Sequence, residues 1–145
     1  MYAKGTAVSV AKSKAEIERI LARYKADQFG IMVDNATQRA AIQFRIQKWI
    51  VRFELQLPSS REEDRAVMQR WRALVLTVKA KLESIESKIE SFEEAFMPHV
   101  VLPDGQTLGR HMLPKLKQIR ESGRMPQTLL PDYSGSPGGS TPASD

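Results

Sequence analysis

Apolar residues recur every three or four positions along residues 58–97, the longest patterned stretch of the chain. This spacing is the period of a helix with one apolar stripe. Ser60 and Glu63 have the spacing of a capping box, and Pro98 cannot donate the next backbone hydrogen bond. The pattern predicts one helix roughly 55 Å long, with a stripe made of Val67, Trp71, Leu74, Val78, Leu82, Ile85, Ile89, Phe92 and Phe96.

A helix of this length exceeds what one small core covers, so part of the stripe is expected to meet a second helix or a second copy of the chain. The first half of this helix is basic and the second half is acidic. Antiparallel pairing of two copies would therefore bring opposite charges together and is compatible with a homodimer. The residues predicted to form this interface are Trp71, Val78, Leu82, Ile85, Ile89 and Phe92.

The first 57 residues alternate between strand and helix patterns. β-Branched residues at every second position predict a strand over Thr6–Val10, and helical spacing predicts a helix over Lys14–Tyr24. A second strand is expected at Phe29–Val33, followed by turn residues Asp34 and Asn35. Period-two alternation on both sides of Gln47-Lys48 then predicts a hairpin, with an inward face made of Ala40, Ile42, Phe44, Ile46, Trp49, Val51, Phe53, Leu55 and Leu57.

Beyond Pro98 the pattern predicts a brief extended segment at 100–102 and a turn at Pro103-Asp104-Gly105. Thr107 is placed to cap a third helix that runs to Ser122, and Gly123 is a suitable stop. Pro114 is expected to kink this helix unless the helix begins there.

These patterns together predict an α+β fold in the order strand, helix, three antiparallel strands, long helix and shorter C-terminal helix. One domain is expected over residues 1–124, with the sheet and first helix in 1–57, the long helix in 58–97 and the remainder in 98–124. Residues 125–145 are rich in Pro, Gly and Ser and are predicted to form a disordered tail.

Composition narrows the range of functions. The 145 residues carry a formal net charge of +5, and the excess lies mainly in residues 1–60, with ten Lys/Arg against five Asp/Glu. With no cysteine, disulfides and thiolate chemistry are excluded. The chain has neither a run long enough to span a membrane nor an apolar block after Met1. No membrane association is expected, and the expected location is the cytoplasm.

Basic residues form two candidate nucleic-acid-binding clusters. On or beside the outward face of the hairpin lie Arg39, Arg45, Lys48 and Arg52, which could track a phosphate backbone. Lys115, Lys117 and Arg120 on the C-terminal helix form the second cluster. The hairpin aromatics are predicted to point inward, so the outward face lacks a platform for base stacking. An ordinary solvated sheet face remains the alternative.

Catalytic and metal-binding patterns are weak. His99 and His111 are the only histidines, and neither has a second ligand at a spacing typical of metal sites. The carboxylates Glu83, Glu86, Glu90, Glu93 and Glu94 crowd the second half of the long helix, where a solvated face is the common outcome. No nucleophile and base lie at a meaningful spacing. Neither an enzyme activity nor a cofactor nor a metal is therefore expected.

Several short stretches carry a resemblance. Lys12–Ile17, Arg70–Leu74 with Lys79–Glu83, and Val101–Gly105 resemble stretches of small uncharacterised proteins of tailed bacteriophages and prophages, over about residues 2–125. Lys25 and Asn35 stand where such proteins often have glycine. The turn after the helix over Lys14–Tyr24 and the turn after the strand over Phe29–Val33 are therefore expected to differ from theirs. The resemblance implies a phage accessory protein that acts inside a bacterial cell, and it assigns no functional residue.

Two functions therefore remain open. In the first, the protein is a non-catalytic nucleic-acid-associated protein that uses its basic sheet face and C-terminal helix. In the second, it binds a host or phage protein through the long helix, as an inhibitor or modulator of a host defence or replication enzyme. The sequence favours the first because the chain is basic, and it identifies neither the partner nor the oligomeric state.

Overall fold

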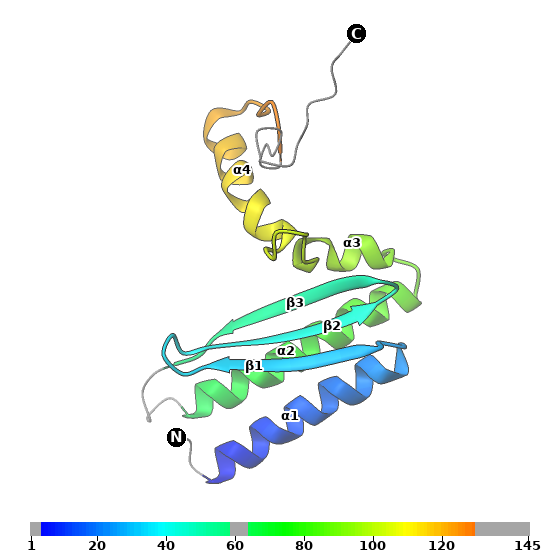
Figure 1. Cartoon of the computed structure of the whole chain (residues 1–145), viewed down its shortest axis with the longest axis vertical. Helices are drawn as coiled ribbons and strands as arrows, with labels where there is room; N and C mark the ends of the chain where they lie inside the picture. The colour runs from blue at the N-terminus through cyan, green and yellow to red at the C-terminus, as the bar shows by residue number, and fades with distance from the viewer. Residues whose placement is uncertain (1–3, 59–63, 130–145) are drawn as a thin grey trace.

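The computed structural model of the chain describes residues 4–58 and 64–129 and confirms the α+β class. The Ser60–Glu63 capping box and most of the predicted tail, residues 130–145, lie outside the described residues. The elements follow one another as α1 (Lys4–Arg23), β1 (Gln28–Asp34), β2 (Arg39–Ile46), β3 (Trp49–Gln56), α2 (Asp64–Glu86), α3 (Phe92–Phe96), a short 3-10 helix (Met97–His99) and α4 (Leu108–Ser122) (Figure 1).

The three strands form an antiparallel sheet in the order β1-β2-β3. The hairpin prediction is confirmed, since β2 and β3 pair from Arg39↔Gln56 to Ile46↔Trp49, and every second residue of β2 from Ala40 to Ile46 is buried. Trp49, which was predicted to point inward, pairs with Ile46 and therefore lies on the inward side of the sheet, but it is not buried there. It begins β3 beside the turn, remains 41% exposed, and donates a hydrogen bond from Nε1 to Glu93 Oε2 at 3.1 Å.

In Figure 1, α2 passes behind the strands and α1 lies below β1; the two helices pack against each other and run parallel. Contacts between them follow the chain direction in both helices, from Thr6–Asp64 through Glu16–Arg72 to Tyr24–Glu86. Their apolar sides and one face of the sheet form a single core, whose most deeply buried large side chains are Trp71, Phe44, Phe96, Ile17, Leu21, Ile42, Val51, Val67, Val75 and Val78. The opposite face of the sheet is left open along β1 and β2.

The predicted strand at Thr6–Val10 is wrong, because α1 begins at Lys4 and includes it. Thr6 and Val10 are 4% and 5% exposed, and Ser13 and Ile17 continue the same buried side at steps of three and four. Burial against α2 and the sheet therefore outweighs the weak helix propensity of β-branched residues. Ser13 and Glu16 have the spacing of a capping box and would cap a helix that began at Lys14, but Ser13 lies inside α1.

The single long helix predicted over residues 58–97 is also wrong. α2 ends at Glu86, and Lys88 adopts a φ of 61°. A separate short helix, α3, begins after Ser91, whose side chain accepts a hydrogen bond from the Glu94 backbone while Glu94 Oε1 accepts one from Ser91 N–H. This reciprocal capping box starts a new helix in a new direction.

Both long helices end in the same way, with a lysine in the left-handed region. Lys25, which has a φ of 68°, and Lys88 occupy the position where a Schellman motif usually has glycine. The motif's hydrogen bonds are present, from Ala26 N to Leu21 O and from Ile89 N to Ser84 O. The turn after α1 thus keeps a glycine-like backbone with a lysine side chain.

The C-terminal part leaves the core along β3. Val100 forms an antiparallel bridge with Val51, and Val101 N–H donates to Ile50 O, so this segment pairs with the outer edge of β3. Thr107 then caps α4, and Gly123 ends it with a φ of 68°, as predicted. Pro114 lies inside α4, which begins at Leu108. In Figure 1, α4 rises away from the sheet and the two long helices.

Candidate functional site

The hairpin cations predicted to bind nucleic acid are largely engaged by the chain itself. Arg45 forms a two-pronged ion pair with Asp27, with Nη2–Oδ2 at 2.7 Å and Nε–Oδ1 at 2.8 Å. Hydrogen bonding by this guanidinium holds the pKa of the Asp27 carboxyl below its usual value. Arg39 donates from Nε to Gln56 Oε1. Lys48 is exposed in the hairpin turn and forms no side-chain hydrogen bond or ion pair with the described residues.

Arg52 has a structural role at the base of α4. Its side chain is only 18% exposed, and Nη2 donates to Gly105 O at 2.6 Å. Glu54 accepts from Arg110 Nη2 at 2.9 Å and lies 3.5 Å from Arg52 Nε. These contacts tie the turn before α4, and α4 itself, to β3. The four hairpin cations therefore do not form one open basic patch.

The predicted helix interface is mostly internal. Trp71, Val78, Leu82 and Phe92 are at most 5% exposed and belong to the core of this chain. Their burial excludes them from contact with a partner in this fold, because α1 and the sheet cover that side of α2, and Phe92 of α3 packs into the same core. Ile85 packs against the core, whereas Ile89 is 76% exposed in the turn between α2 and α3.

α4 is the element with the least support from the rest of the chain. None of its fifteen residues is buried, and Leu113 and Leu116 are 65% and 54% exposed. Among the residues that the structure describes, α4 is attached by its N-terminal end, through Leu108 N–H to Val100 O and through the Arg110–Glu54 pair. α4 thus presents a helix surface that its own core does not cover. The apolar spacing of this helix was visible in the sequence, but its lack of cover was not.

The cations of α4 are available. Within the described part of the chain, the side chains of Lys115, Lys117 and Arg120 form neither a hydrogen bond nor an ion pair. The only carboxylate of α4 is Glu121. Of the two predicted basic clusters, the one on α4 therefore keeps its charge open to a partner.

The two histidines make different contacts and do not lie in one site. His111 Nε2 is 2.7 Å from Asp104 Oδ2, which braces α4 against the preceding turn. The His99 ring stacks on Phe53 with a centroid distance of 4.0 Å. Across residues 4–58 and 64–129, no group of three or more His, Cys, Asp or Glu side chains is arranged to hold a metal ion.

Burial of His99, together with the nearby charge of Lys81, holds the pKa of its imidazole below the usual value. In the unfolded chain histidine has a pKa of about 6.5. Just below that pH the unfolded chain therefore binds a proton that the native state does not bind. We therefore expect the free energy of unfolding to fall as the pH is lowered through this value. His99→Phe, which keeps a stacked ring, should remove that part of the pH dependence in chemical denaturation between neutral and mildly acidic pH.

His111→Asn is the matched control and should retain the pH dependence that arises from His99. An identical pH profile for His99→Phe and the unaltered chain would show that His99 is not the responsible group.

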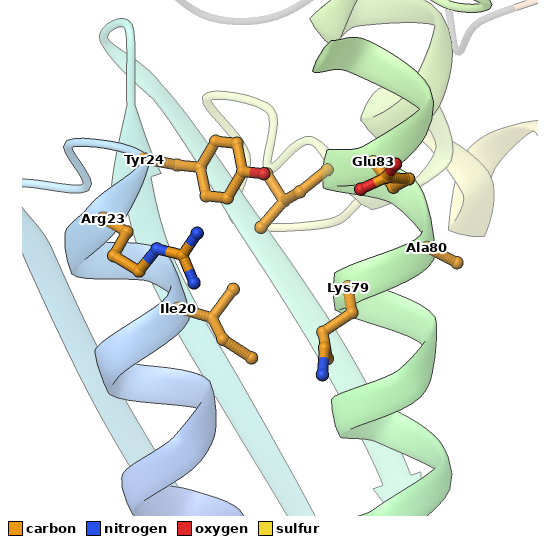
Figure 2. Close-up of a pocket in the computed structure, with 7 residues that line it drawn as sticks. Ile20, Arg23, Tyr24, Lys79, Ala80 and Glu83 are labelled. Atoms are coloured by element: carbon orange, nitrogen blue, oxygen red, sulfur yellow. The ribbon is translucent and has the colours of Figure 1, made fainter. Parts of the chain in front are cut away.

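A groove with a volume of about 340 Å³ lies between α1 and α2 (Figure 2). Tyr24 reaches from the end of α1 toward α2, where its hydroxyl donates to Glu86 Oε2 at 2.5 Å, and this bond raises the Tyr24 pKa. Arg23, Lys79 and Glu83 supply mixed charge along the rim. The groove offers a binding surface of mixed charge between the two helices. It joins residues far apart in sequence, so no local pattern could predict it.

No helix among the described residues combines the length and the apolar character needed to cross a membrane. Comparisons of the chain with protein-family models, with curated proteins and with solved structures gave no match.

Proposed function

We propose that this chain is a non-catalytic binding protein that docks α4, as a basic amphipathic helix, into an acid-rimmed apolar groove of another protein. The observation that carries the proposal is that α4 leaves apolar side chains uncovered. None of its residues is buried, and Leu113 and Leu116 are more than half exposed. This is protein binding, the second of the two functions that the sequence left open, but through α4 rather than α2.

The physical basis is the instability of an uncovered helix. Isolated helices shorter than about 12 to 15 residues are marginal in water, and most helices are held by packing of an apolar face. α4 has fifteen residues, including Gly109 and Pro114, and is attached at one end. A groove that covers Met112, Leu116 and Ile119, spaced i, i+4 and i+7, would supply the missing contact in the way that grooves bind amphipathic helices.

Charge indicates the character of the partner. Arg110 is paired with Glu54, and the three remaining cations Lys115, Lys117 and Arg120 outnumber the single carboxylate of α4. Acidic side chains around the groove would speed association and fix the direction of the helix more than they would add affinity. Nucleic acid would satisfy the same cations but would leave the exposed leucines without an apolar partner. The geometry therefore favours a protein.

The resemblance to small proteins of tailed bacteriophages supports a setting for this activity. As part of the proposal, the protein is a phage accessory factor in the bacterial cytoplasm, and its partner is a host or phage protein such as a defence or replication enzyme.

A photo-crosslinking amino acid, benzoylphenylalanine, placed at position 116 tests the proposal in bacterial cells that produce the protein in its natural setting. Leu116 should give one discrete adduct that protease removes and nuclease leaves intact. The matched control is position 118, because Gln118 is also exposed and lies on the opposite side of α4. Combining the probe at 116 with Lys117→Glu and Arg120→Glu should reduce the adduct several-fold.

Two results would count against protein docking. An adduct that nuclease removes would assign α4 to nucleic acid, and its yield should then fall steeply with added salt, as counterion release requires. Equal labelling at positions 116 and 118, or none at 116, would show that α4 has no specific partner on its apolar side.

A further inference from the structure

The outer edge of β1 is unpaired. β1 pairs with β2 along its whole length, from Gln28↔Arg45 to Asp34↔Arg39, and among the described residues no backbone hydrogen bond joins Phe29–Val33 to any other segment. The opposite edge of the sheet, on β3, is partly covered by Val100 and Val101. The sheet therefore ends in one free row of backbone donors and acceptors.

This edge also lacks the devices that normally prevent strand pairing. Natural proteins protect a free edge with lysine, proline, bulges or covering segments. Phe29–Val33 contains no charge and no proline, and none of its residues has a positive φ. Met32 and Val33 are 54% and 49% exposed, so apolar surface lies directly beside the unpaired backbone. Such an edge is suited to strand addition.

β1 is complementary to itself when two copies run antiparallel around Ile31. In this register Gln28 lies opposite Asp34, Phe29 opposite Val33, and Gly30 opposite Met32, each from the other copy. Because Gly30 and Met32 pair with Gln43 and Ala41 of β2, they belong to the open face, whereas Phe29, Ile31 and Val33 belong to the helix face. Each apolar side chain thus meets either an apolar one or a glycine.

The Gly30–Met32 pairing has a good steric fit. A Cβ built on Gly30 meets nothing within 4 Å, and the open face has a hollow of about 240 Å³ there, bordered by Gln28, Met32, Gln43 and Ile50. Met32 of a second copy would extend over this hollow and lose its own exposure. The largest exposed apolar side chain of β1 therefore faces the position that has no side chain.

Charge at the ends of the strand agrees with the same register. Gln28 lies beside Arg45 of β2, and Asp34 lies beside Arg39. The Asp34 carboxylate of a second copy would stand opposite Gln28, in line with Arg45 of the first. No like charges are brought face to face.

We propose that β1 pairs antiparallel with β1 of a second copy, across a two-fold axis at Ile31, to make a continuous six-stranded sheet. The interaction uses no part of α4 and does not depend on what α4 binds. In the dimer the two open faces become one surface, on which Arg39, Arg45, Lys48 and Arg52 occur twice.

The absence of native cysteine makes this register directly testable. Opposed residues of antiparallel strands have Cα atoms about 4.5 to 5.5 Å apart, within the span of a disulfide. Gly30→Cys and Met32→Cys chains, mixed and oxidised, should give disulfide-linked dimers in up to about half of the dimer population, because random pairing makes half of the dimers mixed. Each variant alone should give far less, since residue 30 does not face residue 30.

Light scattering on the full chain should give twice the monomer mass. Met32→Lys should return it to the monomer mass with an unchanged circular dichroism spectrum, because residue 32 is exposed in the monomer. Leu76→Lys, an exposed position on α2 that lies outside this edge, should leave the dimer intact. A monomer mass for the unaltered chain, or cross-linking as strong with Leu76→Cys as with the mixed pair, would overturn the proposal.

Discussion

Trp71→Ala is expected to lower the free energy of unfolding by about 3 to 5 kcal/mol. Trp71 is 1% exposed at the centre of the core, and Lys14 Nζ lies 5.0 Å above its ring. With Val10 and Leu57 it also lines a hollow of about 480 Å³ between α1 and the sheet. Truncation would enlarge that hollow and remove contacts between α1 and α2. Small domains have a total stability of about 5 to 15 kcal/mol, so the loss is severe.

Urea denaturation followed by circular dichroism measures this change, and the second tryptophan is the matched control. Trp49 is 41% exposed and keeps only one side-chain hydrogen bond, to Glu93, so Trp49→Ala should cost about 1 kcal/mol or less. Equal losses for the two variants would contradict the assignment of Trp71 to the core and Trp49 to the surface.

Gly109→Ala is expected to destabilise the attachment of α4 by about 1 to 3 kcal/mol. A Cβ at this position would lie 2.8 Å from the Pro98 carbonyl oxygen and 3.3 Å from Pro98 Cβ. Since the closest atom belongs to the backbone, it cannot swing aside, and α4 must move off the Met97–His99 turn. Helix propensity alone predicts the opposite sign, because alanine is favoured over glycine in helices by about 1 kcal/mol.

Hydrogen exchange resolved along the chain measures this change. Relative to the unaltered chain, Gly109→Ala should raise the exchange rate of α4 more than that of β2. Gly5→Ala in α1 serves as the control, since a Cβ there meets nothing within 4 Å; at the second residue of the helix the variant should be stabilising by less than about 1 kcal/mol. If Gly109→Ala were stabilising as well, the close packing against Pro98 would have to be wrong.

Local patterns predicted the sheet and α4 well. The hairpin alternates strictly, and a one-residue slip would expose its whole apolar face, so its register was determined by sequence. Thr107 and Gly123 bracket α4 with signals that depend only on neighbouring backbone groups. Asp34 likewise makes the expected turn, accepting hydrogen bonds from Ala36 N and Thr37 N.

Errors arose where two signals competed. Thr6, Val8 and Val10 read as a strand, but Thr6 and Val10 also begin a four-residue spacing that continues through α1. The apolar period across Ile85, Ile89 and Phe92 concealed the end of α2. Ser91 and Glu94 form the capping box that starts α3, and their spacing can be read from the sequence. The continuous apolar period nevertheless predicted one uninterrupted helix across them.

The candidate surfaces could be predicted less well, because exposure depends on contacts between distant residues. Arg45 and Asp27 form an ion pair across 18 positions, and Arg52 reaches Gly105 across 53. Neither pairing has a local pattern, so the hairpin cations looked open in the sequence. The free edge of β1 likewise follows from strand order, which alternation does not determine.

The parallel pairing of α1 with α2 has a consequence during protein synthesis. Contacts between the two helices join residues 56 to 62 positions apart, with the whole sheet in between. At roughly 5 to 20 residues per second, several seconds separate the synthesis of Ile17 and Leu21 from that of the α2 residues that cover them. A nascent chain halted before α2 is complete therefore exposes an uncovered apolar layer, and we expect such chains to aggregate or to engage chaperones.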